Sequence, residues 1–236
     1  MKTYNSFQKI IVIVLLAALL ISLIIPILTA AVYGEEVDPA GSEQTELASD
    51  NRKYNSFDML NKLKEIAPVY MSLGNHEGGA VKKVRDFCRD NGITLLEDAH
   101  TEFEGIRIGG LTSGLIVNDE PVTEHHLEMT PPPNLEWLAS FAELEGYKLL
   151  LNHHPEYYPV YIKPLNIDLT LSGHAHGGQV RIFGKGLIAP GQGFFPKYTS
   201  GMHDGRLIVS RGLANNAPPI PRLFNRTELI FIEFSN

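Results

Sequence analysis

The sequence has one cysteine in 236 residues, Cys88, so no disulfide bond can form within the chain. Cys88 stands in the helix-like stretch VRDFCRDNG with no histidine beside it, and we expect it to be a small buried apolar side chain. Positive charge is also scarce, because 20 lysines and arginines face 27 aspartates and glutamates and the formal net charge is −7. A nucleic-acid groove needs an excess of positive charge, so we expect no nucleic-acid partner.

Residues 10–32 contain no charged side chain and are long enough to cross a bilayer, which takes about 20 apolar residues. Lysines precede this run and acidic residues follow it, and positive charge stays on the cytoplasmic side of a membrane. We therefore predict a single-pass protein of the cell membrane whose domain lies on the extracytoplasmic side. A cleaved signal peptide is the alternative, because Thr-Ala-Ala at 29–31 offers a cleavage site. Residues 1–34 are accordingly assigned as a transmembrane anchor or signal segment.

The rest of the chain divides into an acidic linker, residues 35–50, and one domain, residues 51–236. Apolar residues make up 44% of the sequence, which is enough for a sizeable core. Helical periodicity alternates with short apolar runs that are typical of strands, and this mixture predicts a layered α/β domain. The helical patterns cover 56–67 and 80–92 and lie within 129–146, the strand-like runs end near 73, 152 and 172, and two more strands are expected in RLIVSRGLANN and TELIFIEF.

Three of the apolar runs end in a cluster of polar side chains. These clusters are GNHE at 74–77, the end of LLLNHHPE at 149–156, and the centre of LSGHAHGGQV at 171–180. Taken alone, each is more typical of a turn. Strand ends of α/β proteins meet at one edge, however, and imidazole and amide groups together suit a metal ion. A carboxylate often orients a metal-bound imidazole, and Glu77 and Glu156 are the candidates.

In this order, GNHE, HHPE with its upstream LLLN, and GHAHGGQ resemble the later motifs of the calcineurin-like metallophosphoesterases. The chain looks most like the membrane-anchored bacterial branch of that family, from about Leu47 to the carboxy terminus. The resemblance implies an α/β fold in which two mixed β-sheets pack together and helices flank them, here with an N-terminal transmembrane helix. It also implies an enzyme that hydrolyses a phosphate ester by means of a metal-activated water.

The same resemblance assigns roles to particular residues. Asn75, His153 and His174 would bind one metal ion, and His176 would turn to the other. His76 would lie beside the leaving group and help to protonate it. The ions would be manganese, iron or zinc, two in the family and as few as one here.

This sequence departs from the family pattern upstream of GNHE. The Asp-x-His and Gly-Asp motifs of the family do not stand there in their expected form, and only Glu46 offers a carboxylate near the second of them. The sequence Asp98-Ala99-His100 has the form of the first motif but follows GNHE, so we expect it to be a surface turn. N-terminal strands of the family fold are therefore expected to be missing. A catalytically impaired or non-catalytic member that binds metal or phosphate is the alternative function.

The resemblance implies a phosphate-ester substrate, and a lipid-linked phosphate is one candidate. Aromatic and apolar residues that would line a groove for a lipid are Tyr157 and Tyr158, Phe194 and Phe195, and the segment 218–224. The same residues also suit a hydrophobic core, and we predict the core for them.

Overall fold

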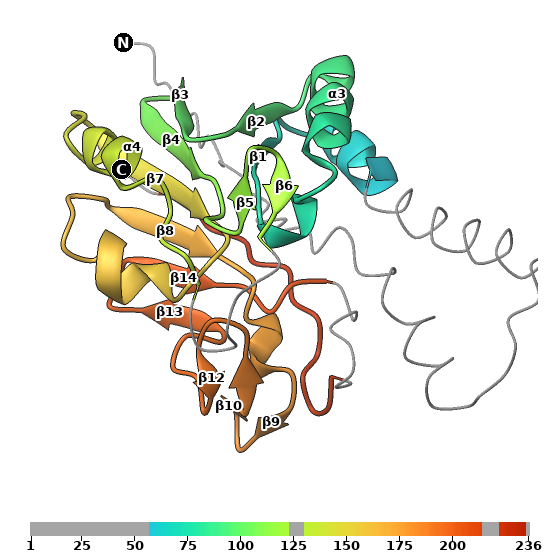
Figure 1. Ribbon diagram of the computed structural model, residues 1–236, viewed down its shortest axis with the longest axis vertical. Coiled ribbons are helices and arrows are strands. Elements are labelled where there is room, and N and C mark those ends of the chain that lie inside the picture. The colour runs from blue at the N-terminus through green and yellow to red at the C-terminus, as the bar shows by residue number, and fades with distance from the viewer. Residues whose placement is uncertain (1–56, 123–129, 214–221, 235–236) are drawn as a thin grey trace, which may run out of the picture.

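The computed structural model describes residues 57–122, 130–213 and 222–234 (Figure 1). The predicted membrane anchor, the acidic linker and Glu46 lie outside these residues, as does the start of the domain assigned to 51–236. Within the described ranges, no helix combines the length and the apolar character that a membrane crossing requires.

A mixed sheet of six strands forms the centre of the domain, in the order β13-β14-β8-β7-β4-β3. Its four inner strands run parallel to one another, and the two edge strands are antiparallel to their neighbours. Inner strands are covered on both faces, which explains why β7 and β8 read as nearly continuous apolar runs. The strands are β3 (Ala99–Phe103), β4 (Ile106–Leu111), β7 (Tyr147–Asn152), β8 (Leu169–Ser172), β13 (Gly201–His203) and β14 (Leu207–Val209).

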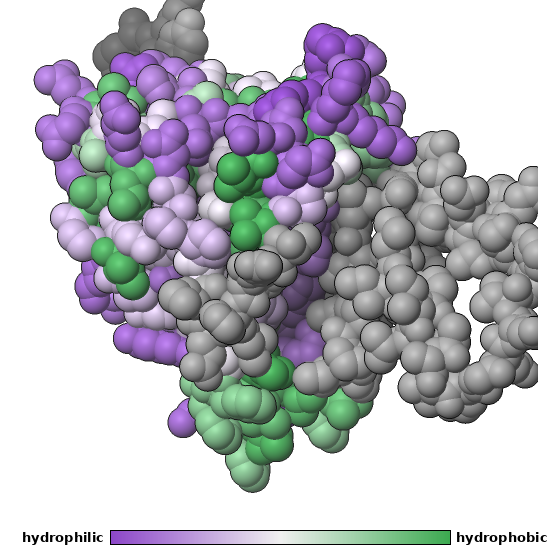
Figure 2. Space-filling model, in the orientation of Figure 1, coloured by the Kyte–Doolittle hydropathy of each residue, from purple (hydrophilic) through white to green (hydrophobic). Residues whose placement is uncertain are grey.

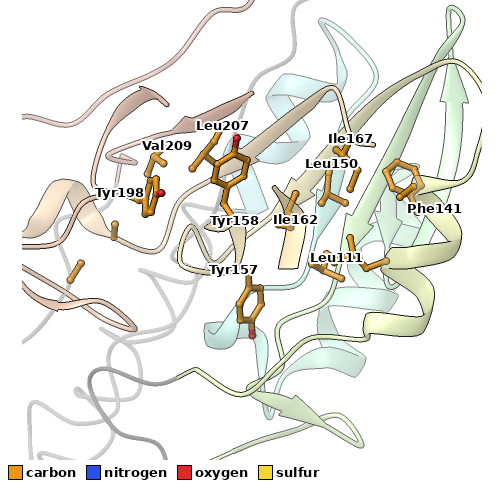
Figure 3. Packing of buried hydrophobic residues seen from close by; sticks show 14 residues of the cluster. Leu111, Phe141, Leu150, Tyr157, Tyr158, Ile162, Ile167, Tyr198, Leu207 and Val209 are labelled. Atoms are coloured by element: carbon orange, nitrogen blue, oxygen red, sulfur yellow. The ribbon is translucent and has the colours of Figure 1, made fainter. Parts of the chain in front are cut away.

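Helices cover one face of this sheet. Helix α4 (Leu135–Ala142) begins at Asn134, whose side chain accepts a hydrogen bond from the Trp137 amide. Phe141 of α4 packs in one cluster with Leu150 of β7 and with Tyr157 and Tyr158, at the start of the helical turn Tyr158–Ile162 (Figure 3). Both tyrosines are buried, so the core prediction for this pair is confirmed.

The other face of the sheet carries a second layer. In the described part of the chain this layer holds the parallel pair β1 (Tyr70–Ser72) and β2 (Thr94–Leu96), which α3 (Val81–Asn91) connects. Helix α3 ends at Gly92 in the left-handed conformation, as the Asn-Gly sequence predicts. Cys88 on α3 is buried against Met71, and burial raises the pKa of its thiol to about 11. The prediction of an apolar role for Cys88 is therefore confirmed.

A mixed sheet with flanking helices agrees with the predicted α/β class. The second of the two predicted sheets is small, because the described ranges contribute only β1 and β2 to it. The segment TELIFIEF accounts for part of the difference between the predicted second sheet and the observed one. Ile230, Ile232 and Phe234 alternate along an extended segment and pack on the same face of the central sheet, but no described strand pairs with them. The prediction of a strand in TELIFIEF is thus wrong for the backbone, since a strand needs a hydrogen-bonded neighbour.

Short two-stranded hairpins make up much of the remainder. They are β5 (Ile116–Val117) with β6 (Glu120–Pro121), β9 (Arg181–Ile182) with β10 (Lys185–Gly186), and β11 (Ile188–Ala189) with β12 (Gly193–Phe194). Phe194 and Phe195 lie on the last of these hairpins and are exposed. The prediction that Phe194 and Phe195 belong to the core is wrong. Their hairpin is too short for the domain to cover both of its faces.

Leu150 offers a test of the central packing. It is fully buried in β7, against the cluster that contains Phe141. Leu150→Ala should lower the free energy of unfolding by about 2–5 kcal/mol, from lost burial and the cavity left behind. Urea denaturation measures this change. Ile66→Ala, at an exposed side chain, should change stability by less than about 0.5 kcal/mol. Equal effects of the two substitutions would contradict the packing described.

Candidate metal centre

The residues of the candidate site follow the ends of four strands, at one edge of the fold. Asn75 lies in the 3-10 turn Asn75–Glu77 that follows β1, and Ser113 follows β4. His153 comes directly after β7, and His174 comes just after the parallel neighbour β8. Parallel strands end on the same side of a sheet, so the loops that follow them converge.

Three side chains from three of these loops meet. The Asn75 Oδ1 atom lies 2.8 Å from His153 Nε2, and His153 Nε2 lies 3.1 Å from His174 Nδ1. Ligand atoms that share one ion at bond lengths of 2.0–2.1 Å are separated by about 2.8–3.4 Å, from octahedral to tetrahedral geometry. The spacing and the chemistry of these donors therefore fit a divalent cation. Three of the residues named from the sequence are brought together in one place.

Burial keeps the two central imidazoles neutral. The pKa values of His153 and His174 lie well below the usual range, because both rings are buried and because other imidazoles, His154 foremost, stand close to them. A neutral imidazole has a free nitrogen lone pair, which is the form that binds metal. The site is therefore ready to accept a cation at neutral pH without first losing a proton.

His76 and His176 stand beside this group. Burial lowers the pKa of His76 to about 4, with further contributions from His176 and His154. The His76 ring meets the His153 ring edge-on at a centroid distance of 6.4 Å. Burial, followed by the charge of Arg222, lowers the pKa of His176 to about 4. The described contacts that join Asn75, His153 and His174 do not include His176.

A second network lies behind the three donors. His154 is fully buried, and both of its ring nitrogens are engaged, Nε2 with Ser113 Oγ at 2.6 Å and Nδ1 with Glu156 Oε1 at 3.0 Å. The Thr130 hydroxyl donates to the same Glu156 oxygen at 2.7 Å. His154 is thus held in place from both sides by contacts with other side chains.

His174 connects the two groups. Its Nδ1 faces His153, while its Nε2 lies 3.8 Å from Glu156 Oε1. Within the described ranges, His154, Glu156 and His174 also lie close enough together to hold an ion. We favour the Asn75 side, because a metal-bound imidazole usually turns its other nitrogen toward a carboxylate. Glu156 forms its imidazole hydrogen bond with His154 and lies 3.8 Å from His174, so its role in orienting a metal-bound imidazole stays a prediction.

Glu77 has a different place from the one predicted. Its carboxylate accepts a hydrogen bond from the Gly74 amide at 2.7 Å, and it braces the turn that carries Asn75. Burial raises the pKa of Glu77 to about 8, so the group is largely protonated at neutral pH. Among the described residues, no imidazole forms a hydrogen bond with the Glu77 carboxyl group.

Close packing explains two of the glycines. A Cβ atom on Gly74 would lie 2.7 Å from the ring of His153. Gly177 has a φ of 68°, and a Cβ there would lie 2.2 Å from Asn225 Oδ1. The Asn225 amide donates to the backbone oxygens of His176 at 2.6 Å and Gln179 at 3.0 Å, and these bonds fix the turn that follows the second histidine of GHAHGG.

Sequence reasoning missed three residues of this region: Ser113, Thr130 and Asn225. None belongs to a motif, and each acts through a contact between segments far apart in the chain, so the sequence held no signal for them. His100 lies exposed on β3, away from strand ends that carry the site, and the Asp98 carboxylate accepts from the Thr112 amide. The expectation of a surface turn at 98–100 is wrong for Ala99 and His100, because both belong to β3, which pairs with β4.

Gly74→Ala should weaken metal binding. The backbone at Gly74 has a φ of −96°, which alanine adopts without strain, so the added methyl group acts only by pushing the His153 ring away. We expect the affinity for the metal ion to fall at least about tenfold. This is the lower end of the loss seen when a group that holds a metal ligand in place is changed. Isothermal titration with Mn²⁺ or Zn²⁺ measures it, and unchanged affinity would contradict the geometry.

Glu77→Gln should have an effect that grows with pH. The folded-state pKa is raised to about 8 from 4.5. Between these values the unfolded chain loses its proton while the folded chain keeps it, so Glu77 increasingly destabilises the fold as pH rises. Glutamine cannot ionise and retains an oxygen for the Gly74 amide. The variant should nearly equal the parent protein in stability near pH 4.5 and exceed it by about 4 kcal/mol near pH 8.

Urea denaturation at the two pH values checks this expectation. A stability difference between Glu77→Gln and the parent protein that does not change with pH would show that the buried carboxyl is not the titrating group.

Comparison with known proteins gives the family. The profile of the calcineurin-like phosphoesterase family matches residues 38–178. The uncharacterised metallophosphoesterase YkoQ of Bacillus subtilis is 29% identical over 184 residues, which cover 73% of this chain and 62% of that protein. The phosphodiesterase YaeI of Escherichia coli is 32% identical over 136 residues, 53% of this chain and 43% of that protein.

The chain therefore spans less than two thirds of the length of these relatives. No solved structure gave a significant match. The profile match covers more than half of the sequence and includes all three strand-end clusters. By these matches the chain belongs to the calcineurin-like phosphoesterase family of hydrolases.

Proposed function

We propose that this protein hydrolyses a phosphate ester with the help of a divalent cation held by Asn75, His153 and His174. The observation that carries the proposal is the meeting of these three donor atoms, at 2.8 and 3.1 Å, from three separate loops. Hydrogen bonding alone does not require two neutral imidazole nitrogens and an amide oxygen to face one another. One cation bound by all three donor atoms would account for this arrangement.

When bound, a cation at this place polarises a phosphoryl oxygen and lowers the pKa of a water that can attack phosphorus. The three donors carry no charge, so they leave the positive charge of the ion available to a phosphate group. This matters in a chain whose formal net charge is −7, which does not attract phosphate by itself. Nitrogen and oxygen donors in this combination suit manganese, iron and zinc alike.

We assign His76 to the leaving group. Its pKa of about 4 leaves the ring neutral at pH 7, with one N–H to donate to an ester oxygen. The negative charge of a phosphate beside the ring would raise this pKa. A raised pKa favours the imidazolium form, which can pass a proton to the departing oxygen.

The second ion of the family would rest on His176. Among the described residues, no group of three or more histidine, cysteine, aspartate or glutamate side chains that could hold an ion includes His176, and Glu46 lies outside these residues. Two-metal hydrolases place their ions about 3.5–4 Å apart, and each ion has its own ligands. This incomplete second position supports the alternative function, in which the domain binds metal or phosphate without turnover.

For the substrate, we propose a phosphodiester or monoester whose alcohol has an apolar part. The name of the Escherichia coli relative, a phosphodiesterase, favours the diester. The exposed aromatic residues on the hairpins that follow His176 favour an apolar group, and a lipid-linked phosphate meets this description. Anchoring of the domain outside the cytoplasm by residues 10–32 remains a proposal from the sequence.

Replacing one donor tests the metal centre and its chemistry together. His174→Ala should reduce the affinity for Mn²⁺ or Zn²⁺ by more than about 100-fold, since a direct ligand matters more than the 10–100-fold effect of its supports. Hydrolysis of nitrophenyl phosphate and bis-nitrophenyl phosphate should fall to background. His100→Ala, an exposed histidine on β3, is the matched control and should leave both measurements unchanged.

The two functions predict different results in the parent protein. Tight metal binding with hydrolysis supports the enzyme, and tight binding without hydrolysis supports the non-catalytic alternative. A protein that binds none of manganese, iron and zinc would contradict both.

A further inference from the structure

Exposed apolar side chains gather on the hairpins that follow the metal centre. Phe183 is 100% exposed, Phe224 88% and Phe195 80%. We call this group the aromatic patch; it consists of Ile182, Phe183, Phe194, Phe195, Leu223 and Phe224. In Figure 2 the corresponding region is the green area at the bottom of the molecule, where Figure 1 shows β9, β10 and β12. Large apolar side chains that are this exposed usually mark a surface that binds a membrane or another molecule.

Backbone contacts hold the parts of the aromatic patch together. Val180 forms a β-bridge with Leu223, and the Arg181 amide donates to the Leu223 oxygen at 3.0 Å. The Leu187 amide donates to the Val180 oxygen at 2.9 Å, and Phe195 donates to Leu187 at 2.8 Å. The patch is thus one surface with a fixed backbone rather than a set of unrelated side chains.

The two stretches that form the aromatic patch are basic in a chain that is acidic, and Glu228 is the carboxylate that acts on Arg181 and Arg222 among them. The stretches 180–200 and 222–226 contain no aspartate or glutamate, although the chain as a whole has a net charge of −7. Their basic residues are Arg181, Lys185, Lys197, Arg222 and Arg226. Lys185, Lys197 and Arg226 are exposed beside the aromatic side chains. Basic residues that surround exposed aromatic ones complement an anionic, partly apolar surface.

We propose that the aromatic patch docks the domain onto a membrane surface that contains anionic lipids. The phenylalanine rings enter the headgroup region, and the lysine and arginine side chains contact lipid phosphates. A symmetric contact with a second copy is disfavoured, because it would bring two basic surfaces together. The Leu187 amide also donates to the Gly178 oxygen at 3.0 Å, so the patch is tied to the turn that carries His176. Docking therefore brings the metal centre close to the lipid surface.

A local probe tests this proposal in the full chain. Cys88 is buried, so a thiol-directed dye such as NBD reacts with an introduced cysteine. Lys185→Cys places the dye in the aromatic patch, and Lys83→Cys places it on the exposed side of α3 as the matched control. Each substitution removes one lysine. With vesicles of phosphatidylcholine and phosphatidylglycerol, the dye at 185 should shift to the blue and be quenched by brominated lipid, and the dye at 83 should not.

The dye responds only to its own surroundings. It therefore reports whether the aromatic patch itself contacts lipid, even if residues 10–32 bind vesicles as well. Phe183→Ser combined with Phe195→Ser should abolish the shift at 185, whereas Phe231→Ser, at another exposed phenylalanine, should not. Lys197→Ala should raise the lipid concentration for half of the shift about fivefold, and added salt should act in the same direction.

Three results would overturn the proposal. One is an equal response of the two dyes to anionic vesicles. Another is a shift at 185 that appears without vesicles as the protein concentration rises, which would mean that a second copy covers the patch. The third is a shift caused by an oligonucleotide in place of vesicles, which would assign the aromatic and basic residues to nucleic acid.

Discussion

The parallel pairing of β7 with β8 is the constraint on which the candidate site depends. Its register places Leu151 opposite Leu171, so that His153 and His174 leave the sheet side by side. A slip of one residue would turn the apolar side chains of a strand from one face to the other and would separate the two imidazoles. The core clusters on the two faces of the sheet therefore fix the geometry of the site as well as the fold.

Crowding of imidazoles is tolerable here because burial keeps them uncharged. His76, His153, His154, His174 and His176 influence one another electrostatically, and a proton on one ring opposes a proton on the next. The same burial that makes charging costly leaves lone pairs available to a cation. Fixed supports behind the rings, with Glu156 and Ser113 on either side of His154, hold the group in place.

Much of the fold was predictable from local pattern. Helix α3 followed from its periodicity and from Asn91-Gly92 at its end, and β7 and β8 followed from apolar runs that stop at polar clusters. The grouping of Asn75, His153 and His174 came from the resemblance of motifs, since spacing along the chain does not state which loops meet. The roles of these residues stay predictions.

What the sequence did not reveal depends on contacts between distant segments. Ser113, Thr130 and Asn225 matter only because folding brings them beside His154, Glu156 and Gly177. Phe194 and Phe195 were predicted to be core because phenylalanine is usually buried, yet both are exposed, and no described part of the chain forms a layer over their hairpin. In the TELIFIEF segment, Ile230, Ile232 and Phe234 alternate and pack on the sheet, but a pattern on one strand cannot supply a partner strand.

The position of Cys88 has a consequence for the surroundings in which the domain can keep its shape. The sole sulfhydryl of the chain sits under α3 beside Met71, with its pKa raised to about 11, so it is neither a thiolate nor within reach of an oxidant. No covalent crosslink within the chain holds the fold, and none can be reduced. The folded domain is consequently indifferent to the glutathione poise of a cytosol and to the oxidising conditions of a cell exterior.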